Sequence, residues 1–166
     1  MNVRPHVYET RLRWTGAGHG PTTSYKAYSR EYVVEVNGKT TLRGSADPHF
    51  LGDAALHNPE DLLVASLSAC HLLSYLAECA RAGIEVVSYE DDARGEMTLI
   101  DGAIRFREVV LRPKVAIADA ARVDEAHALH ERAHAVCFIA NSVNFPVRHV
   151  AAVSTVQASP SRIASS

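Results

Sequence analysis

Three cysteines, Cys70, Cys79 and Cys137, carry the most reactive side chains of this chain. In a reducing compartment three cysteines cannot form a structural disulfide framework, so each is a buried apolar residue, a metal ligand or a reactive thiol. Cys70 lies about halfway along a predicted helix, between Ala69 and His71, and such small or polar neighbours leave a sulfur accessible. Cys79 lies in an apolar stretch of the same helix and is predicted to be a core residue.

Cys137 follows three histidines at helical spacing. His127, His130 and His134 precede it in steps of three and four residues, which keep all four side chains on one face of a helix. The plain interpretation of the histidines is a solvated polar face. The alternative is a tetrahedral zinc site made of His130, His134 and Cys137, with a fourth ligand from the first helix. The ligand spacing matches no compact zinc motif, which favours the solvated face.

Nucleophilic chemistry at a cysteine needs a thiolate, because the protonated thiol is a poor nucleophile and its reference pKa is about 8.5. A helix dipole cannot be the main source of the necessary positive charge, since Cys70 lies about three turns into its helix and the effect fades within the first turn. An arginine stays charged, and a carboxylate can hold it in place. Arg30 and Glu60 are the candidates for this pair.

The elements that position these residues are alternating strands and two helices. Asn58-Pro59-Glu60-Asp61 combines a cap, a first-turn proline and two acids, so a helix is predicted from Asn58 to Arg81, closed by Gly83. Its apolar residues lie nearly all round, which is typical of a central core helix. A second helix is expected from Asp119 or Asp124 to between Cys137 and Ala140. Strands are predicted at 8–14, 32–36, 40–42, 85–97, 104–111, 114–118 and 147–155.

This order of elements predicts an α+β fold with antiparallel sheets and two main helices. A single domain is expected over residues 1–166, with a frayed tail at 156–166. An apolar content of 47% is enough for a core, and a net charge of -2 offers no basic face for nucleic acid. No run of about 18 apolar residues suggests a membrane span, and residues 1–14 lack a secretory signal. These features predict a cytoplasmic protein whose partners are small molecules or other subunits.

Three segments carry a resemblance to a known family. Residues 58–71, NPEDLLVASLSACH, resemble the Asn-Pro-Glu helix of the OsmC/Ohr organic hydroperoxide reductases, including the ten-residue step from Glu60 to the peroxidatic cysteine. Residues 133–143 fall where that family places its resolving cysteine, although the family's Cys-Pro pair is Cys137-Phe138 here. Residues 28–31 resemble the early strand that carries the activating arginine. Arg43 is the reserve for Arg30 in this role.

The resemblance implies a two-cysteine peroxidase mechanism. The Cys70 thiolate attacks the distal peroxide oxygen and becomes a sulfenic acid, and Cys137 then condenses with it to a disulfide. Members of this family are reduced by dithiols such as lipoylated proteins and use no bound organic cofactor. The resemblance also implies an intertwined homodimer with active sites at the subunit interface. A resident metal is not expected.

The spacing of Glu60 and Cys70 constrains this mechanism. Ten residues of straight helix separate them by about 15 Å along the axis, at about 1.5 Å per residue, so they cannot easily share one arginine. Either the helix is broken between them, or Glu60 serves Cys70 of the partner chain. The cross-subunit arrangement is the prediction.

Two further expectations remain open. Aromatic residues are predicted as walls for hydrophobic hydroperoxides: Phe50, Tyr75, Phe138 and Phe145. The alternative function is a non-catalytic small-molecule or zinc-binding protein on the same scaffold, in which His130, His134 and Cys137 would form the site.

Overall fold

A three-stranded antiparallel sheet forms the first part of the chain. Its strands β1 (Arg11–Trp14), β2 (Tyr32–Glu35) and β3 (Leu42–Gly44) pair in this order. The hairpin predicted at Asn37-Gly38 joins β2 to β3, and Gly38 adopts the positive φ of 73° that this turn requires. Gly44 lies against the ring of Tyr32, and a Cβ atom at this position would be 2.3 Å from the ring. Glycine is therefore required there for Tyr32 to keep its place.

The long helix α1 runs without interruption from Pro59 to Ala82. At its start the backbone N–H of Asp61 donates to Oδ1 of Asn58 at 2.7 Å, and the N–H of Asn58 donates to the Asp61 carboxylate at 3.4 Å. This reciprocal arrangement satisfies two groups that have no partner within the helix. Gly83 follows α1 with a φ of 70°, and Arg122 donates to its carbonyl at 3.0 Å. The predicted helix start and stop are confirmed.

By length and composition alone, α1 is apolar enough to cross a membrane, with a mean hydropathy of 1.5. This differs from the sequence-based expectation that no run of apolar residues suggests a span. It is weak evidence, because the core helix of a soluble protein meets the same criterion. The helix also carries Glu78, whose buried carboxylate forms ion pairs with Arg81 and Arg132 at 2.5 and 2.6 Å.

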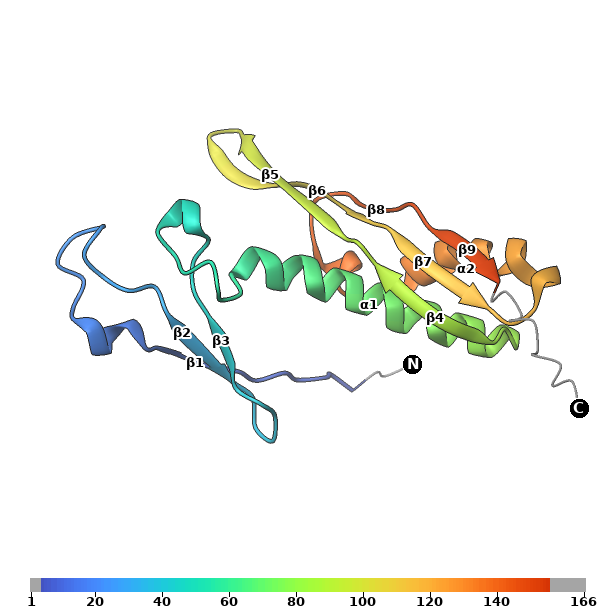
Figure 1. Cartoon of the computed structure of the whole chain (residues 1–166), viewed down its shortest axis with the longest axis horizontal. Coiled ribbons are helices and arrows are strands. Elements are labelled where there is room, and N and C mark those ends of the chain that lie inside the picture. Colours follow the sequence, from blue (N-terminus) through green and yellow to red (C-terminus); the bar gives the residue numbers. More distant parts are fainter. Residues whose placement is uncertain (1–3, 156–166) are drawn as a thin grey trace, which may run out of the picture. The chain divides into compact units, whose positions relative to one another are not determined.

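The second part of the chain contains two more three-stranded sheets (Figure 1). In each sheet an antiparallel pair, β4 with β7 or β5 with β6, is extended by a parallel strand, β9 or β8. Both sheets therefore contain the antiparallel pairs that the sequence predicts, and each is mixed because one parallel strand is added at its edge. The strands are β4 (Val86–Asp91), β5 (Arg94–Ile100), β6 (Ala103–Leu111), β7 (Pro113–Ile117), β8 (Val147–His149) and β9 (Ala152–Thr155).

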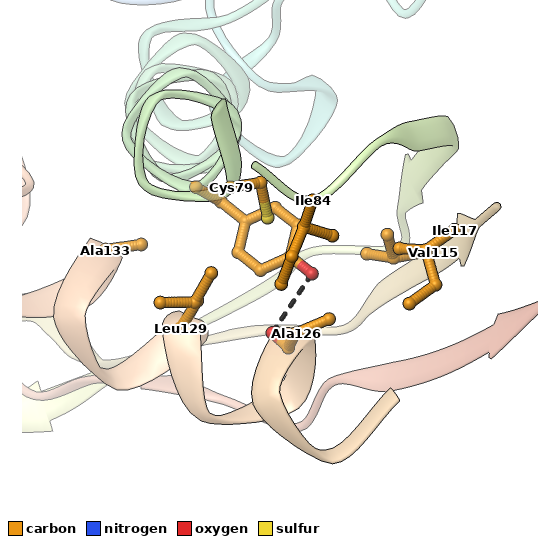
Figure 2. Close-up of a cluster of buried hydrophobic side chains, with 8 residues drawn as sticks. Cys79, Ile84, Val115, Ile117, Ala126, Leu129 and Ala133 are labelled. Carbon is orange, nitrogen blue, oxygen red and sulfur yellow. Dashed lines mark hydrogen bonds between the residues drawn. The ribbon is translucent and has the colours of Figure 1, made fainter. Parts of the chain in front are cut away.

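The second helix, α2 (Val123–Val136), packs with α1 and the sheet around the larger hydrophobic core. Figure 2 shows this core, in which side chains from α1, α2 and β7 meet. The Tyr75 ring is fully buried there, and its hydroxyl donates to the carbonyl of Ala126 at 3.1 Å. Cys79 belongs to this core at 1% exposure, as the sequence predicts. A smaller core surrounds Leu67, Val109 and Leu111.

The α+β class with two main helices is confirmed. The structure is a computed structural model that describes residues 4–155. It divides into two compact units, Met1–Leu63 and Val64–Ser166. The single domain expected over 1–166 stays a prediction, and the tail expected at 156–166 lies outside the described residues.

Candidate functional site

Cys70 and Cys137 lie next to each other in the second unit. Cys70 is half-buried on α1, and Cys137 is the first residue after α2, with 1% of its surface exposed. The backbone N–H of Ile139 donates to Sγ of Cys70 at 3.5 Å. Burial, followed by a hydrogen bond with the Cys70 side chain, raises the pKa of Cys137 to about 11. The two free thiols are therefore neighbours in different environments, and Cys137 is protonated at neutral pH.

The turn after Cys137 is fixed by the side chains of Asn141 and Ser142. The Asn141 amide donates to the carbonyls of Ala135 and Cys137, both at 3.0 Å, and its backbone N–H also donates to Cys137 at 3.0 Å. Ser142 Oγ donates to the carbonyl of Phe138 at 2.7 Å. These bonds hold the chain that places Ile139 against Cys70. Sequence reasoning missed Asn141, although asparagine side chains commonly form hydrogen bonds with nearby backbone groups.

Arg30 and Glu60 line one pocket of the first unit. The pocket has a volume of about 360 Å³. Tyr32 also lines it, and burial and then the negative charge of Glu60 raise the pKa of Tyr32. Oε2 of Glu60 is buried and has no hydrogen-bond partner among residues 4–155. The lining residues are Arg30, Tyr32, Ser45, Ala46, Asp47, Phe50, Pro59 and Glu60.

The guanidinium of Arg30 is held by neighbouring backbone and rings. It donates to the carbonyl of Tyr28 at 2.6 Å and to that of Tyr25, and it lies 4.1 Å from the centre of the Tyr28 ring. Within the described part of the chain no ion pair joins Arg30 to Glu60. The reserve candidate Arg43 pairs with Glu31 at 3.5 Å and does not line the pocket.

The three histidines of α2 differ in exposure: His127 lies on the exposed face that the sequence predicts, His134 is half-buried and His130 is buried. His130 is fully buried, because it shares the inward face of α2 with Ala126, Leu129 and Ala133. Its Nδ1 atom makes a hydrogen bond of 3.0 Å with Nε2 of His71 on α1. The solvated-face expectation is therefore wrong for His130.

The zinc alternative is not supported by the structure. Among residues 4–155, no group of three or more His, Cys, Asp or Glu side chains is placed to hold a metal ion. His130 faces His71 instead, and Cys137 faces Cys70.

The predicted aromatic walls have different environments. Phe50 lines the pocket of Arg30 and Glu60. Phe138 is 80% exposed directly after Cys137. Phe145 packs against Phe106 with ring centres 5.3 Å apart. Tyr75 belongs to the core, as described above. Only Phe50 and Phe138 are therefore placed where a ligand could touch them.

The buried histidines predict a loss of stability in acid. Burial first, and then neighbouring histidine charges, lowers the pKa of His71 to about 4 and that of His130 to about 3. Below about pH 6.5 these histidines take up protons in the unfolded chain but not in the folded chain. The free energy of unfolding therefore falls as the pH is lowered from about 6.5 towards 4. Above pH 6.5 these two histidines do not change the free energy of unfolding. Urea unfolding at pH 5 should show a loss of about 1 to 2 kcal/mol per histidine relative to pH 7.5.

A matched control separates this effect from other histidines. The variant His19→Asn, which changes an exposed histidine of the first unit, should keep the full acid loss. The double variant His71→Gln with His130→Asn should lose most of it. An equal acid loss in all three proteins would contradict the assignment.

Comparisons with known proteins give the family. The family model described as OsmC-like protein matches residues 52–150. An OsmC-like protein of unknown function from Vibrio cholerae O1 biovar eltor superposes with a TM-score of 0.82 at 31% identity, over 89% of this chain and 100% of that chain. An organic hydroperoxide resistance protein from Elizabethkingia anophelis shares the fold with a TM-score of 0.65 at 22% identity, over 92% of this chain and 99% of that chain.

A curated relative is similar over part of its length. YmaD, an uncharacterized protein of Bacillus subtilis (strain 168), is 24% identical over 89 residues, which are 52% of this chain and 59% of YmaD. The match thus spans about three fifths of that relative. Since the family model covers more than half of the chain, this protein is a member of the OsmC-like family.

Proposed function

We propose that this protein is a thiol-dependent peroxidase that reduces organic hydroperoxides through Cys70 and Cys137. The observation that carries the proposal is the adjacency of two free thiols, one half-buried on α1 and one buried at the end of α2. Membership of the OsmC-like family supports it, as does the fold shared with a protein named for organic hydroperoxide resistance.

The chemistry follows from the different environments of the two sulfurs. The Cys70 thiolate attacks the distal oxygen of the hydroperoxide, so that an S–O bond forms, the O–O bond breaks, and the leaving alkoxide takes up a proton to become an alcohol. Cys137 keeps its proton at neutral pH during this step, because its pKa is raised to about 11. It then attacks the sulfenic sulfur, and its proton leaves with the displaced hydroxide as water.

Arg30 and Glu60 are proposed to activate the reacting sulfur and the peroxide. Glu60, whose Oε2 atom has no hydrogen-bond partner among residues 4–155, lines the same pocket as the Arg30 guanidinium. If the Arg30 side chain rotated away from its backbone contacts, it would form an ion pair with Glu60. The pocket is open enough for an organic hydroperoxide, and Phe50 gives it an apolar wall.

The continuity of α1 supports a site shared between two subunits. Glu60 and Cys70 lie ten residues apart on one unbroken helix, about 15 Å along its axis. A break in the helix is therefore no explanation for the shared arginine. We place Glu60 and Arg30 of one subunit at Cys70 of its partner.

An exposed apolar stripe on α1 supports the homodimer. The exposed positions of the second unit's part of α1 recur every three or four residues and carry only alanine and leucine up to position 80: Ala65, Ala69, Leu73, Leu76 and Ala80. Leu73 is 66% exposed in the single chain. A second copy of the chain that covers this stripe would remove its apolar surface from water and so stabilise a dimer.

The same proposal includes the reductant and the location. Phe138 is 80% exposed beside Cys137 and offers an apolar surface to a dithiol on an aliphatic arm, such as that of a lipoylated protein. The cytoplasm supplies the reducing conditions that return the disulfide to two thiols.

A thiol count tests the proposed function directly. The reduced chain has three free thiols, and one equivalent of cumene hydroperoxide should lower the count to one per chain. Peptide mapping should identify the lost pair as Cys70 and Cys137. Retention of all three thiols after the dose would contradict the proposal.

The activating arginine can be tested by a matched pair of variants. Arg30→Gln removes the guanidinium that lines the pocket and should lower kcat/KM for cumene hydroperoxide by about 10²-fold. Arg43→Gln breaks only an exposed ion pair with Glu31 and should leave the rate within about twofold. The reverse order of effects would transfer the role to Arg43.

A further inference from the structure

Five histidines lie ring beside ring between α1, α2 and β8. The centres of His71 and His130 are 5.3 Å apart, and those of His71 and His149 are 5.4 Å apart. His134 lies 5.6 Å from His149, and His127 lies 6.3 Å from His130. His71 and His130 are fully buried, although the peroxide chemistry described above uses neither.

His71 and His130 share a single hydrogen bond of 3.0 Å between Nε2 and Nδ1. A neutral imidazole has one N–H and one bare nitrogen, so one ring donates and the other accepts. The second nitrogens, Nδ1 of His71 and Nε2 of His130, are buried and have no partner among residues 4–155. Whichever ring donates, this bond is the only one that the pair makes through its ring nitrogens in the described chain.

The bond connects the two helices that carry the reactive thiols. His71 directly follows Cys70 on α1. His130 precedes Cys137, the residue that follows α2, by seven residues, or about two helical turns. The geometry of the His71–His130 pair therefore helps to set where α2 ends relative to Cys70.

Other ties between α1 and α2 do not involve the histidines. The Tyr75 hydroxyl donates to the carbonyl of Ala126, and burial raises the pKa of Tyr75. Arg132 of α2 pairs with the buried Glu78 of α1 at 2.6 Å. These ties hold α1 and α2 together independently of the histidine pair.

The surroundings of the pair offer little compensation for a positive charge. The titratable groups that face it are Tyr75 of α1, His127, Glu131 and His134 of α2, and His149 of β8. Glu131 is the one carboxylate in this set, and it contacts His149 at 3.4 Å with 79% of its side chain exposed. One added proton places a charge in the core, and a second makes donors of both facing nitrogens, which abolishes their hydrogen bond.

We infer that the neutral His71–His130 pair positions Cys137 against Cys70, and that protonation of this pair in acid displaces Cys137 and slows closure of the disulfide. The inference rests on the proposed function for its second step, the condensation of the two thiols. His71 and His130 act through the helices that they join and are positioning residues.

The experiment measures disulfide closure without a peroxide. Reduced protein is treated with diamide, which accepts two electrons and two protons from a pair of thiols. The Cys70–Cys137 disulfide is quantified by mass spectrometry after alkylation, from pH 3.5 to pH 8. The comparison protein is His71→Gln with His130→Asn, in which an amide N–H and an amide oxygen replace Nε2 and Nδ1 and keep a hydrogen bond that does not titrate.

The ratio of the wild-type to the variant closure rate at each pH isolates the effect of the histidines, because both proteins contain the same thiols. The ratio of wild-type to variant rate should be close to one between pH 7.5 and pH 5 and fall to about a quarter by pH 3.5, because the pKa of His71 is lowered to about 4. The variant His130→Leu, which removes the bond at every pH, should close the disulfide slowly even at pH 7.5. A ratio that stays constant from pH 3.5 to pH 8 would overturn the inference.

A measurement on the unaltered protein covers the case in which the variants do not fold. The NMR ring resonances of His71 and His130 should titrate below pH 5. Over the same pH range the rate of diamide-driven disulfide closure should fall more steeply than protonation of the thiols alone would cause. Ring titration near pH 6.5 with closure unaffected would overturn the inference. Because diamide needs no peroxidase activity, a protein that fails to consume hydroperoxide but shows the pH-dependent ratio would refute the proposed function alone.

Discussion

Replacement of Cys70 by serine is expected to abolish the consumption of cumene hydroperoxide. The serine hydroxyl is not ionised at neutral pH and cannot form the sulfenic acid, so the rate should fall below about a thousandth of the wild-type rate. The measurement is a ferrous-xylenol assay of remaining peroxide with dihydrolipoamide as reductant. A Cys70→Ser protein with full turnover would contradict the assignment of the peroxidatic sulfur.

The other two cysteines provide the controls for this result. Cys137→Ser should consume one equivalent of peroxide and stop, leaving a Cys70 sulfenic acid that dimedone traps. Cys79 is as buried as Cys137 but lies in the hydrophobic core. A folded Cys79→Ser protein should therefore consume peroxide at the wild-type rate. Loss of peroxide consumption by Cys79→Ser with unchanged circular dichroism would oppose its assignment as a core residue.

Mixing two inactive variants is expected to restore activity. Glu60→Gln lacks the proposed partner of Arg30, and Cys70→Ser lacks the reacting sulfur. In a mixed dimer with shared sites, one site has both an intact Glu60 and an intact Cys70, and the other site has neither. Random exchange of subunits should therefore recover about a quarter of the wild-type rate.

The mixing experiment also distinguishes the alternative geometry. If Glu60 acts at Cys70 of its own chain, every site in the mixture lacks one of the two groups, and no activity returns. The double variant mixed with the unaltered protein gives the reference for subunit exchange. Sedimentation of each variant should show the same dimer, since neither residue belongs to the exposed stripe of α1.

Local signals in the sequence predicted the ends of the main elements well. Asn58 and Asp61 mark the start of α1, and Gly83 marks its end, because caps and left-handed glycines act within a few residues. The same holds for the turn at Gly38 between β2 and β3. Cys70 and Cys137 were also found as a pair, through segments whose residues resemble a known family.

Partners that are distant in the chain were not predictable in this way. The pairing of β8 with β6 depends on residues that are 38 positions apart, such as Val109 and Val147, and a strand pattern does not name its neighbour. The burial of His130 was missed because a histidine on an alanine-rich helix favours solvent, whereas here the ring stacks on Tyr75 and bonds to His71. Its environment is provided by α1 and β8.

The two parallel strand pairs affect the order in which the protein can assemble. Val109 aligns with Val147, and Lys114 aligns with Ala152, so each ladder joins residues that are 38 positions apart, with α2 between them. Pairing over such separations is slow compared with hairpin formation. A newly made chain therefore passes through a period in which its sulfurs lack their native surroundings, and oxidant present during that period would favour mispaired crosslinks over the native one.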